Sequence, residues 1–186
     1  MSSGILAARA AEKICCGLLR ALGLLLAGFA VLGISTAAFG QRKPSEPARA
    51  FVVMPAQSLD DLQKTLKPEN KTSELIDSAG MQLRVAVQHE KNRAGAVAEL
   101  HDASDDVYYV LDGSAMLTLG GRLDSPKETD PGEWRSPKII DGKTFEIKKG
   151  DLIVVPRGTP HQRSTENKDF TMILIKIYAE PLKKRG

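Results

Sequence analysis

The sequence predicts an all-β domain preceded by a short helix and an export signal. Between residues 80 and 180, β-branched and aromatic residues either alternate with polar ones or form short apolar runs, which is typical of strands. Clusters of Gly, Pro, Asn and Asp separate these runs and mark turns. At 186 residues the chain has room for one domain and its extensions.

Residues 1–40 have the layout of a secretory signal peptide. Three basic residues, the last of them Arg20, precede an uncharged apolar run from Ala21 to Ile34, and small residues follow as far as Gly40. This order predicts cleavage near Ala38 or Gly40 and a periplasmic or secreted protein that is free of the membrane. The alternative is an uncleaved anchor, because residues 21–39 are nearly as long as the roughly 20 residues that span a bilayer.

Removal of the signal leaves a cysteine-free, nearly neutral protein. Cys15 and Cys16 both lie inside the signal, so no disulfide or thiolate metal site is expected. The mature chain keeps 23 Lys and Arg against 22 Asp and Glu, a net charge of +1. These charges are interspersed, apart from a short basic tail over 181–186, so the sequence predicts no nucleic-acid partner.

The mature chain opens with a linker and a helical extension. Residues 41–57 are rich in Pro and charge and predict a linker. Ser58, with Asp61 three residues later, fits the N-terminal cap of a short helix whose apolar positions include Leu62 and Leu66 and which ends near Pro68. We assign residues 58–79 to this extension and residues 80–180 to the β-domain.

Two stretches of the β-domain combine strand-forming residues with polar groups that can hold a metal ion. The first is ELHDASDDVYYVLDG, from Glu99 to Gly113, and the second is GDLIVVPRGTPH, from Gly150 to His161. Alternation along a strand places Glu99 and His101 on one face, about 6.5–7 Å apart. After a turn at residues 102–105, Asp106 shares the inner face of the next strand with Tyr108 and Val110, so it can face the same ion.

These stretches resemble the two signature motifs of the cupin superfamily. The second motif matches at Gly150, Pro156, Gly158 and His161, with Thr165 where Asn is usual. In the first motif, His101, Asp106 and Gly113 match the second histidine, the acidic residue and the closing glycine, whereas Glu99 replaces the first histidine and Arg93 the opening glycine. The resemblance implies a single-domain, exported, bacterial-type cupin: a double-stranded β-helix, or jelly-roll, barrel with a metal at its mouth.

The predicted metal ligands are Glu99, His101, Asp106 and His161. Imidazole and carboxylate without thiolate suit one divalent transition metal, namely manganese, iron, zinc or nickel. Asp106 is shorter than the usual glutamate and reaches the ion either directly or through water. The alternative is a barrel without metal, in which the histidines are satisfied by hydrogen bonds.

Four further side chains bear on the site. Glu99 and Tyr108 are the predicted catalytic groups, Tyr108 as a pocket wall with a hydroxyl within reach of a ligand. Arg163 has the strand parity of His161 and is a candidate clamp for a carboxylate or phosphate of the substrate, or else a rim residue paired to an acid. Lys176, the only charge in an apolar strand, is expected at an edge or facing outward, and His89 is more consistent with a structural role than with a fifth metal neighbour.

A long polar segment separates the two motifs. Residues 119–147 are rich in Gly, Pro and charge, which predicts a loop rather than a second domain. The segment contains Trp134, the only tryptophan, which we predict to act as a lid that binds substrate or as a subunit contact. The alternative is that it plugs one end of the barrel.

Two classes of function fit these residues. One is an exported metalloenzyme of the oxygenase, isomerase, lyase or decarboxylase type that acts on a small polar organic molecule. The other is a non-catalytic module that binds a small ligand or a metal. No nucleophile motif, phosphate loop or dinucleotide fingerprint is present in the sequence. Open strand edges, which need cover, predict a homodimer.

Overall fold

The computed structural model describes residues 44–77 and 80–180. The predicted signal peptide and the basic tail lie outside these residues. None of the helices described is long and apolar enough to span a bilayer. The elements are α2 (Ala56–Leu66), β1 (Lys71–Ile76), β2 (Leu83–Lys91), β3 (Ala98–His101), β4 (Ser104–Leu119), β5 (Arg122–Leu123), β6 (Lys127–Asp130), β7 (Glu133–Ser136), β8 (Ile139–Ile140), β9 (Lys143–Lys148), β10 (Leu152–Val155), β11 (His161–Ser164) and β12 (Asp169–Tyr178).

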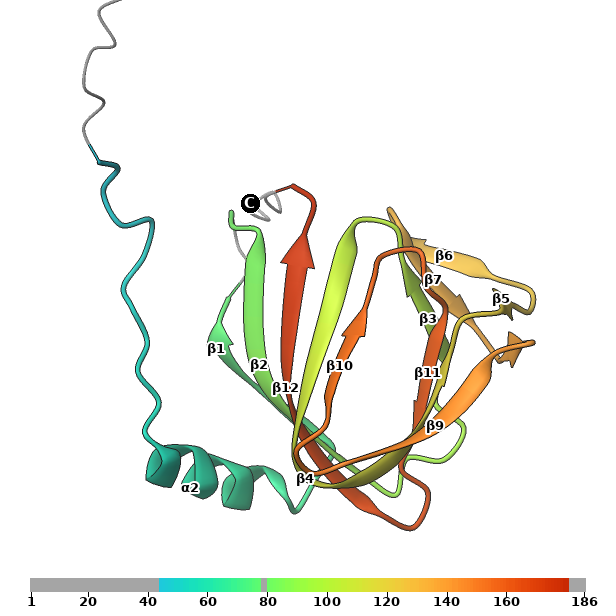
Figure 1. Ribbon diagram of the computed structural model, residues 1–186, viewed down its shortest axis with the longest axis horizontal. Helices are drawn as coiled ribbons and strands as arrows, with labels where there is room; N and C mark the ends of the chain where they lie inside the picture. The colour runs from blue at the N-terminus through green and yellow to red at the C-terminus, as the bar shows by residue number, and fades with distance from the viewer. Residues whose placement is uncertain (1–43, 78–79, 181–186) are drawn as a thin grey trace, which may run out of the picture. The chain divides into compact units, whose positions relative to one another are not determined.

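The domain is all-β, with antiparallel strands that curl into a jelly-roll barrel (Figure 1). Ten of the strands form one continuous sheet, in which β1, β2, β12 and the first half of β4 make one layer, joined by β10. β11, β3, β7 and β6 make the other layer, together with β9. β5 and β8 pair separately. The predicted all-β double-stranded β-helix with a short N-terminal helix is therefore confirmed.

Strand β4 joins the two layers. Its first half pairs with β12 and β10, and its second half pairs with β9 and β11. The change of partners occurs at Gly113, which adopts a φ of 75°. A side chain at this position would collide with the backbone carbonyl of Asp169 on the adjacent strand. The closing glycine of the first motif is therefore needed for both its conformation and its close approach to β12.

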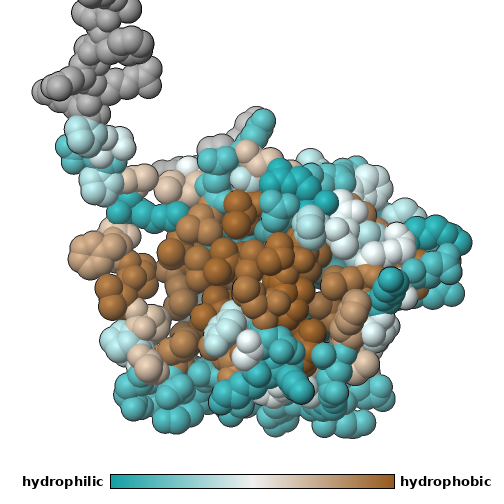
Figure 2. Space-filling view, in the orientation of Figure 1, coloured by the Kyte–Doolittle hydropathy of each residue, from teal (hydrophilic) through white to brown (hydrophobic). Residues whose placement is uncertain are grey.

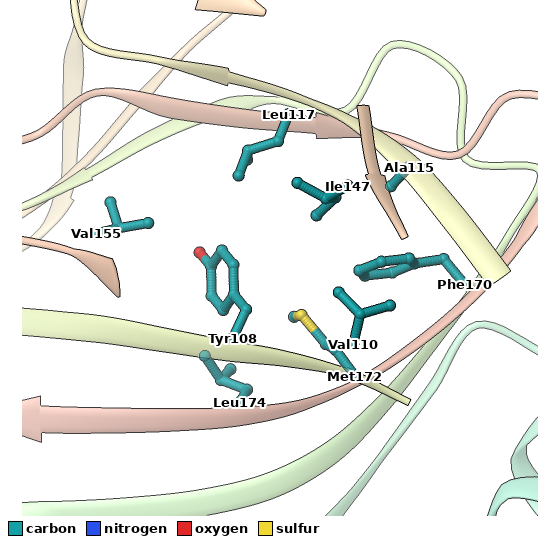
Figure 3. Packing of buried hydrophobic residues seen from close by; sticks show 9 residues of the cluster. All are labelled: Tyr108, Val110, Ala115, Leu117, Ile147, Val155, Phe170, Met172 and Leu174. Carbon is teal, nitrogen blue, oxygen red and sulfur yellow. The ribbon is translucent and has the colours of Figure 1, made fainter. Parts of the chain in front are cut away.

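The closed part of the barrel is filled by apolar side chains from both layers (Figure 3). Inward positions of β4 and β12 supply most of them, because alternate residues of a strand share one face. The cluster consists of Tyr108, Val110, Ala115, Leu117, Ile147, Val155, Phe170, Met172 and Leu174. The ring of Tyr108 lies between Val155 and Met172, and the ring of Phe170 lies at the other end of the cluster from Val155 (Figure 3).

The segment between the motifs is not the loop that the sequence predicts. It forms strands β5 to β9, and β7 adds to the sheet beside β3, with Trp134 opposite Leu100. Its Gly and Pro residues mark turns between short strands. β6 is exposed at every residue, so it lacks the apolar alternation that identifies a strand in the sequence.

The N-terminal extension contains the predicted short helix, but the helix begins earlier than expected and a strand follows it. Helix α2 begins at Ala56 after Pro55, and no side chain caps it, so Ser58 lies inside the helix. Residues 71–76, which we assigned to the helical extension, instead form strand β1 and pair with β2. Pro68 keeps the helix from continuing into this segment, and the edge of β2 provides hydrogen-bond partners for its backbone instead.

Candidate metal centre

The predicted ligands lie on three strands that meet at the mouth of the barrel. Glu99 and His101 are on β3, and His161 at the start of β11 is directly opposite Glu99. Asp106 is on β4, opposite Lys176 of β12. Strand register thus brings together residues that are up to 62 positions apart in sequence.

Three of the ligands form a tight cluster. Ligand atoms of Glu99, His101 and His161 all lie within 4.8 Å of one another. Glu99 Oε2 is 3.8 Å from His101 Nε2 and 3.7 Å from His161 Nε2. Ligand atoms about 2.0–2.2 Å from a tetrahedral ion lie roughly 3.3–3.6 Å apart. The two distances from Glu99 are slightly wider than this, and none of the three exceeds 4.8 Å, so side-chain shifts would be needed to close the cluster around an ion.

Both imidazoles are oriented for metal binding. His101 Nδ1 lies 2.7 Å from Glu133 Oε2, and His161 Nδ1 lies 3.0 Å from the carbonyl of Thr159. A neutral ring that donates from Nδ1 keeps a lone pair on Nε2. Within residues 44–77 and 80–180, both buried Nε2 atoms lack a hydrogen-bond partner. Unpaired buried nitrogens are costly, and a metal ion would satisfy them.

Asp106 is adjacent to this cluster but is shared with other partners. Its Oδ2 lies 3.5 Å from His101 Nε2 and 3.9 Å from His161 Nε2. The hydroxyl of Tyr108 donates to the same oxygen at 3.2 Å. Oδ1 lies 3.1 Å from Lys176 Nζ, an ion pair without the alignment of a directed hydrogen bond. Asp106 is therefore within reach of an ion held by the other three residues, as a fourth ligand or through water.

The carboxylates of the site are ionised. Burial raises the pKa of Glu99, but the nearby imidazole of His161 and the charge of Arg135 outweigh it and lower the pKa to about 2. Burial likewise opposes ionisation of Asp106, whose pKa is nevertheless about 2 because His101 and Lys176 favour the anion. Such ionised oxygens suit a divalent cation.

The cluster borders a cavity of about 720 Å³. Glu99, His101 and Asp106 line it, whereas His161 lines a small adjoining space together with Glu99. Most of the remaining wall is charged or aromatic, with apolar residues on one side. These wall residues include Arg84, Arg93, Tyr108, Glu133, Arg135, Arg163, Met172, Leu174 and Lys176.

The two other predicted polar residues take different positions. Tyr108 is buried beside Asp106, and burial raises the pKa of its hydroxyl well above the ordinary value. Arg163 lines the cavity, but its guanidinium donates to both carboxylate oxygens of Glu90, at 2.9 and 2.6 Å. It also lies over the Tyr108 ring, 5.2 Å from the centroid. Arg163 is thus paired to an acid, as the alternative proposed, but inside the barrel rather than on the rim.

Trp134 does not face the metal centre. On β7, Glu133 and Arg135 point to the cavity, so Trp134 between them points to the opposite face. Its indole Nε1 donates to Asp102 Oδ2 at 2.7 Å, and it lines a separate groove with Leu100. The prediction that Trp134 binds substrate is therefore not supported by its position, because strand alternation turns it away.

Lys176 was placed wrongly by sequence reasoning. Strand β12 lies between β2 and β4 (Figure 1), so it has no free edge. The lysine side chain is 10% exposed and faces the cavity beside Asp106. Its single charge within an apolar run was the available signal, since a buried lysine needs a carboxylate partner. His89, by contrast, pairs with Thr171 at 2.8 Å and does not line the cavity, which agrees with a structural role.

Glu90 and Glu133 were not predicted at all. Glu133 orients His101, and Glu90 holds Arg163 and Arg93. Each depends on a contact between strands that are distant in sequence. The position of Glu133 beside Trp134 in a polar segment gave no sign that β7 would pair with β3.

Comparison with known proteins adds likenesses of fold. No family model matches the chain. A stretch of 62 residues is 32% identical to an uncharacterized protein of Methanocaldococcus jannaschii, and the match covers 33% of each protein. The chain is similar to a solved cupin protein from Bacteroides fragilis, with 20% identity, coverage of 63% of this chain and 85% of that one, and a TM-score of 0.40. A double-stranded β-helix protein from Klebsiella pneumoniae shows 15% identity, 65% and 90% coverage, and a TM-score of 0.46.

The barrel carries both sequence motifs on the strands that form its mouth. His101 and Asp106 of the first motif and His161 of the second converge there, and Gly113 closes the first motif at the bend of β4. The fold and the positions of these residues therefore agree with the resemblance to cupins that the sequence shows.

Proposed function

We propose that this protein is a metal-dependent cupin enzyme that acts on a small polar organic molecule. One observation carries the proposal: two buried imidazole Nε2 atoms, unpaired among the residues described, converge with ionised carboxylates beside a cavity of about 720 Å³. Small-molecule sites usually measure about 300–1,000 Å³. The charged and aromatic wall suits a polar ligand of limited size.

Glu99, His101 and His161 would hold the ion, with Asp106 in reach as a fourth ligand. Manganese, iron, zinc and nickel all suit this donor set. When bound, such an ion polarises a carbonyl or activates water or dioxygen. Glu133 and the carbonyl of Thr159 keep the imidazoles in the required tautomer.

The surrounding side chains can move and hold protons. Glu99 is ionised and faces the cavity, so it can accept a proton from a bound molecule. Tyr108 stays neutral and donates its hydroxyl hydrogen to Asp106. This arrangement supports oxygenase, isomerase, lyase or decarboxylase chemistry, and a non-catalytic binding module is the alternative.

Substitutions of Glu99 distinguish an enzyme from a binding module. Small carboxylates, phenols and sugars would first be screened for turnover by the metal-loaded protein. Glu99→Gln removes the charge at constant size and should abolish turnover or weaken metal retention with the fold intact. Glu99→His restores the usual motif and should keep the metal but change reactivity. Turnover and metal content that are unchanged in both variants would reject a role for Glu99. Absence of turnover together with tight ligand binding would favour the binding module.

Export is the second part of the proposal. The basic start, apolar run and small residues of positions 1–40 support it. Expression in a Gram-negative host, followed by fractionation and N-terminal sequencing, should find mature protein that begins near residue 39 or 41 in the periplasm. Full-length protein in the membrane fraction would indicate an anchor instead.

Homodimer formation is the third part. Figure 2 shows apolar side chains gathered over the face that carries β10 and β12. Leu152 and Val154 on β10, Tyr109 on β4 and Ile177 on β12 are all more than 40% exposed. Burial of such a face against a second copy would remove it from water. Sedimentation should detect a dimer that Leu152→Glu weakens, and a monomer at micromolar concentration would contradict this.

A further inference from the structure

Lys176 is the least explained charged group in the cavity. Its side chain is 10% exposed, and it follows the apolar run from Met172 to Ile175 near the end of β12. Lysine is almost never fully buried unless it is paired. Asp106 is its one ion-pair partner among the residues described, and the contact lacks hydrogen-bond alignment. An ammonium has three N–H donors, so Lys176 can donate to a further acceptor in the cavity.

The other cations of the cavity already have carboxylate partners. Arg84 donates to both oxygens of Glu74, and Arg163 and Arg93 share Glu90. Arg135 is held by Glu133 and the carbonyl of Trp134. A ligand that recruited any of these arginines would have to displace a carboxylate. Lys176 is therefore the cation best placed to bind an incoming anion.

A second donor lies on the same cavity wall as Lys176. Ser104 precedes Asp106 by two residues on β4, so the two side chains share one face. Its hydroxyl lines the cavity, is buried, and has no partner within the part of the chain that the structure describes. Buried hydroxyls normally find a hydrogen-bond partner. Ser104 and Lys176 thus give the wall around Asp106 two donors that need an acceptor.

The charge balance of the cavity favours an anion as well. The charged wall residues and their partners comprise five cations against six carboxylates, a net charge of −1 with neutral histidines. A divalent ion at the metal centre changes this balance to +1. Because an uncompensated charge is costly inside a protein, one negative charge on the ligand would restore neutrality.

We propose that Lys176, with Ser104 on the same cavity wall, is the subsite for an anionic group of the substrate, so that the metal centre acts on small monoanionic organic acids. The proposal rests on the metal-dependent function given above and specifies its substrate class. Lys176 would take the carboxylate-binding role that the sequence assigned to Arg163. The acid would lie in the cavity between Lys176 and the cluster of Glu99, His101 and His161.

Calorimetric titration with glycolate and its uncharged amide, glycolamide, tests the proposal on metal-loaded protein. The two probes differ in the carboxylate, so their affinity ratio reports on recognition of charge. Lys176→Met should weaken glycolate binding about 10- to 100-fold, because a charge-assisted hydrogen bond is lost. Glycolamide affinity should change by less than about twofold. Lys176→Gln, which can still donate a hydrogen bond, should also lose the preference for glycolate.

The controls separate this proposal from the metal assignment. Lys168→Met removes an exposed lysine that pairs with Glu146 outside the cavity and should leave both affinities unchanged. Metal content is measured on each sample by elemental analysis. Two results would overturn the anion subsite alone, provided that the protein binds metal. One is an unchanged glycolate affinity in both Lys176 variants. The other is no glycolate binding to the wild type at 10 mM, about the weakest affinity of interest. Absence of metal from the wild type would overturn the proposed function instead.

Discussion

The closed end of the barrel and its mouth are built from the same strands but differ in their inward-facing side chains, which are apolar at the closed end and polar at the mouth. Along β4, the inward positions Val110, Ala115 and Leu117 fill the closed end with apolar atoms. Toward the mouth, Ser104 and Asp106 occupy the equivalent inward positions. Tyr108 lies at the boundary, with its ring in the apolar cluster and its hydroxyl on Asp106.

This difference separates stability from function within one fold. At the closed end, the side chains of the cluster are apolar except for the hydroxyl of Tyr108 and are stabilised by packing. At the mouth, buried nitrogens of His101 and His161 and the hydroxyl of Ser104 lack partners among the described residues. A protein can keep such groups only if the rest of the structure compensates for their cost. Substitutions at the closed end should therefore affect unfolding, and those at the mouth should affect ligands.

The largest effect is expected from Phe170→Ala at the closed end. Phe170 is 1% exposed and belongs to the apolar cluster, so its loss leaves a cavity and should lower the free energy of unfolding by about 3–5 kcal/mol. Urea denaturation would measure the change, and metal content should remain that of the wild type. A loss below about 1 kcal/mol would show that the cluster does not hold the barrel together.

Glu90→Gln should have the next largest effect, because it breaks a buried ion pair between the two regions. Arg163 would keep its charge without a partner, which typically costs about 3 kcal/mol or more. Glu146→Gln, at an exposed surface pair, is the matched control and should change stability by less than about 0.5 kcal/mol. Equal stability of the two variants would contradict the importance of the buried pair.

The same carboxylate predicts a pH dependence. Burial alone would raise the pKa of Glu90, but the hydrogen bonds and charges of Arg163 and Arg93 lower it below the unfolded value of 4.5. Because the folded pKa is depressed, this contribution to stability is fully present above pH 4.5 and is lost as the pH falls through the folded pKa. The free energy of unfolding would be measured from pH 6 to pH 3, about the range over which such carboxyls titrate. It should decrease less steeply with falling pH in Glu90→Gln than in the wild type. Parallel curves of unfolding free energy against pH for the two proteins would contradict this contribution of Glu90 to stability.

Glu133→Gln should weaken metal binding while the protein stays folded. Glu133 Oε2 accepts a hydrogen bond from His101 Nδ1 at 2.7 Å and so orients the ligand. Loss of such an orienting group usually lowers metal affinity about 10- to 100-fold. Competition with a chelator would measure the affinity, with Glu128→Gln on neighbouring β6 as the control. Equal affinity in Glu133→Gln and the wild type would remove Glu133 from the site.

The smallest effect is expected from Trp134→Phe. This change removes one partly exposed hydrogen bond, from Nε1 to Asp102, which should cost about 0.5–1.5 kcal/mol. Metal content and glycolate affinity should stay at wild-type values because Trp134 faces away from the cavity. A change in either value would restore the ligand-binding role that the sequence suggested.

The sequence predicted the fold and the centre of the site better than it predicted their surroundings. Apolar alternation and the two motifs identified the barrel, and the spacing of Glu99, His101, Asp106 and His161 identified the cluster. Lys176, Glu133 and Glu90 act through partners on other strands, and those pairings depend on a register that no local pattern contains. For the same reason, the strands of residues 122–148 looked like a loop.

Elemental analysis tests the central claim most directly. Purified mature protein from cells supplied with manganese, iron, zinc and nickel should contain close to one transition-metal ion per chain. His101→Ala and His161→Ala should each lose this ion and still show the cooperative unfolding of a folded barrel. Stoichiometric metal that survives in both variants, or a wild-type protein that takes up no transition metal, would contradict the assignment of the metal centre.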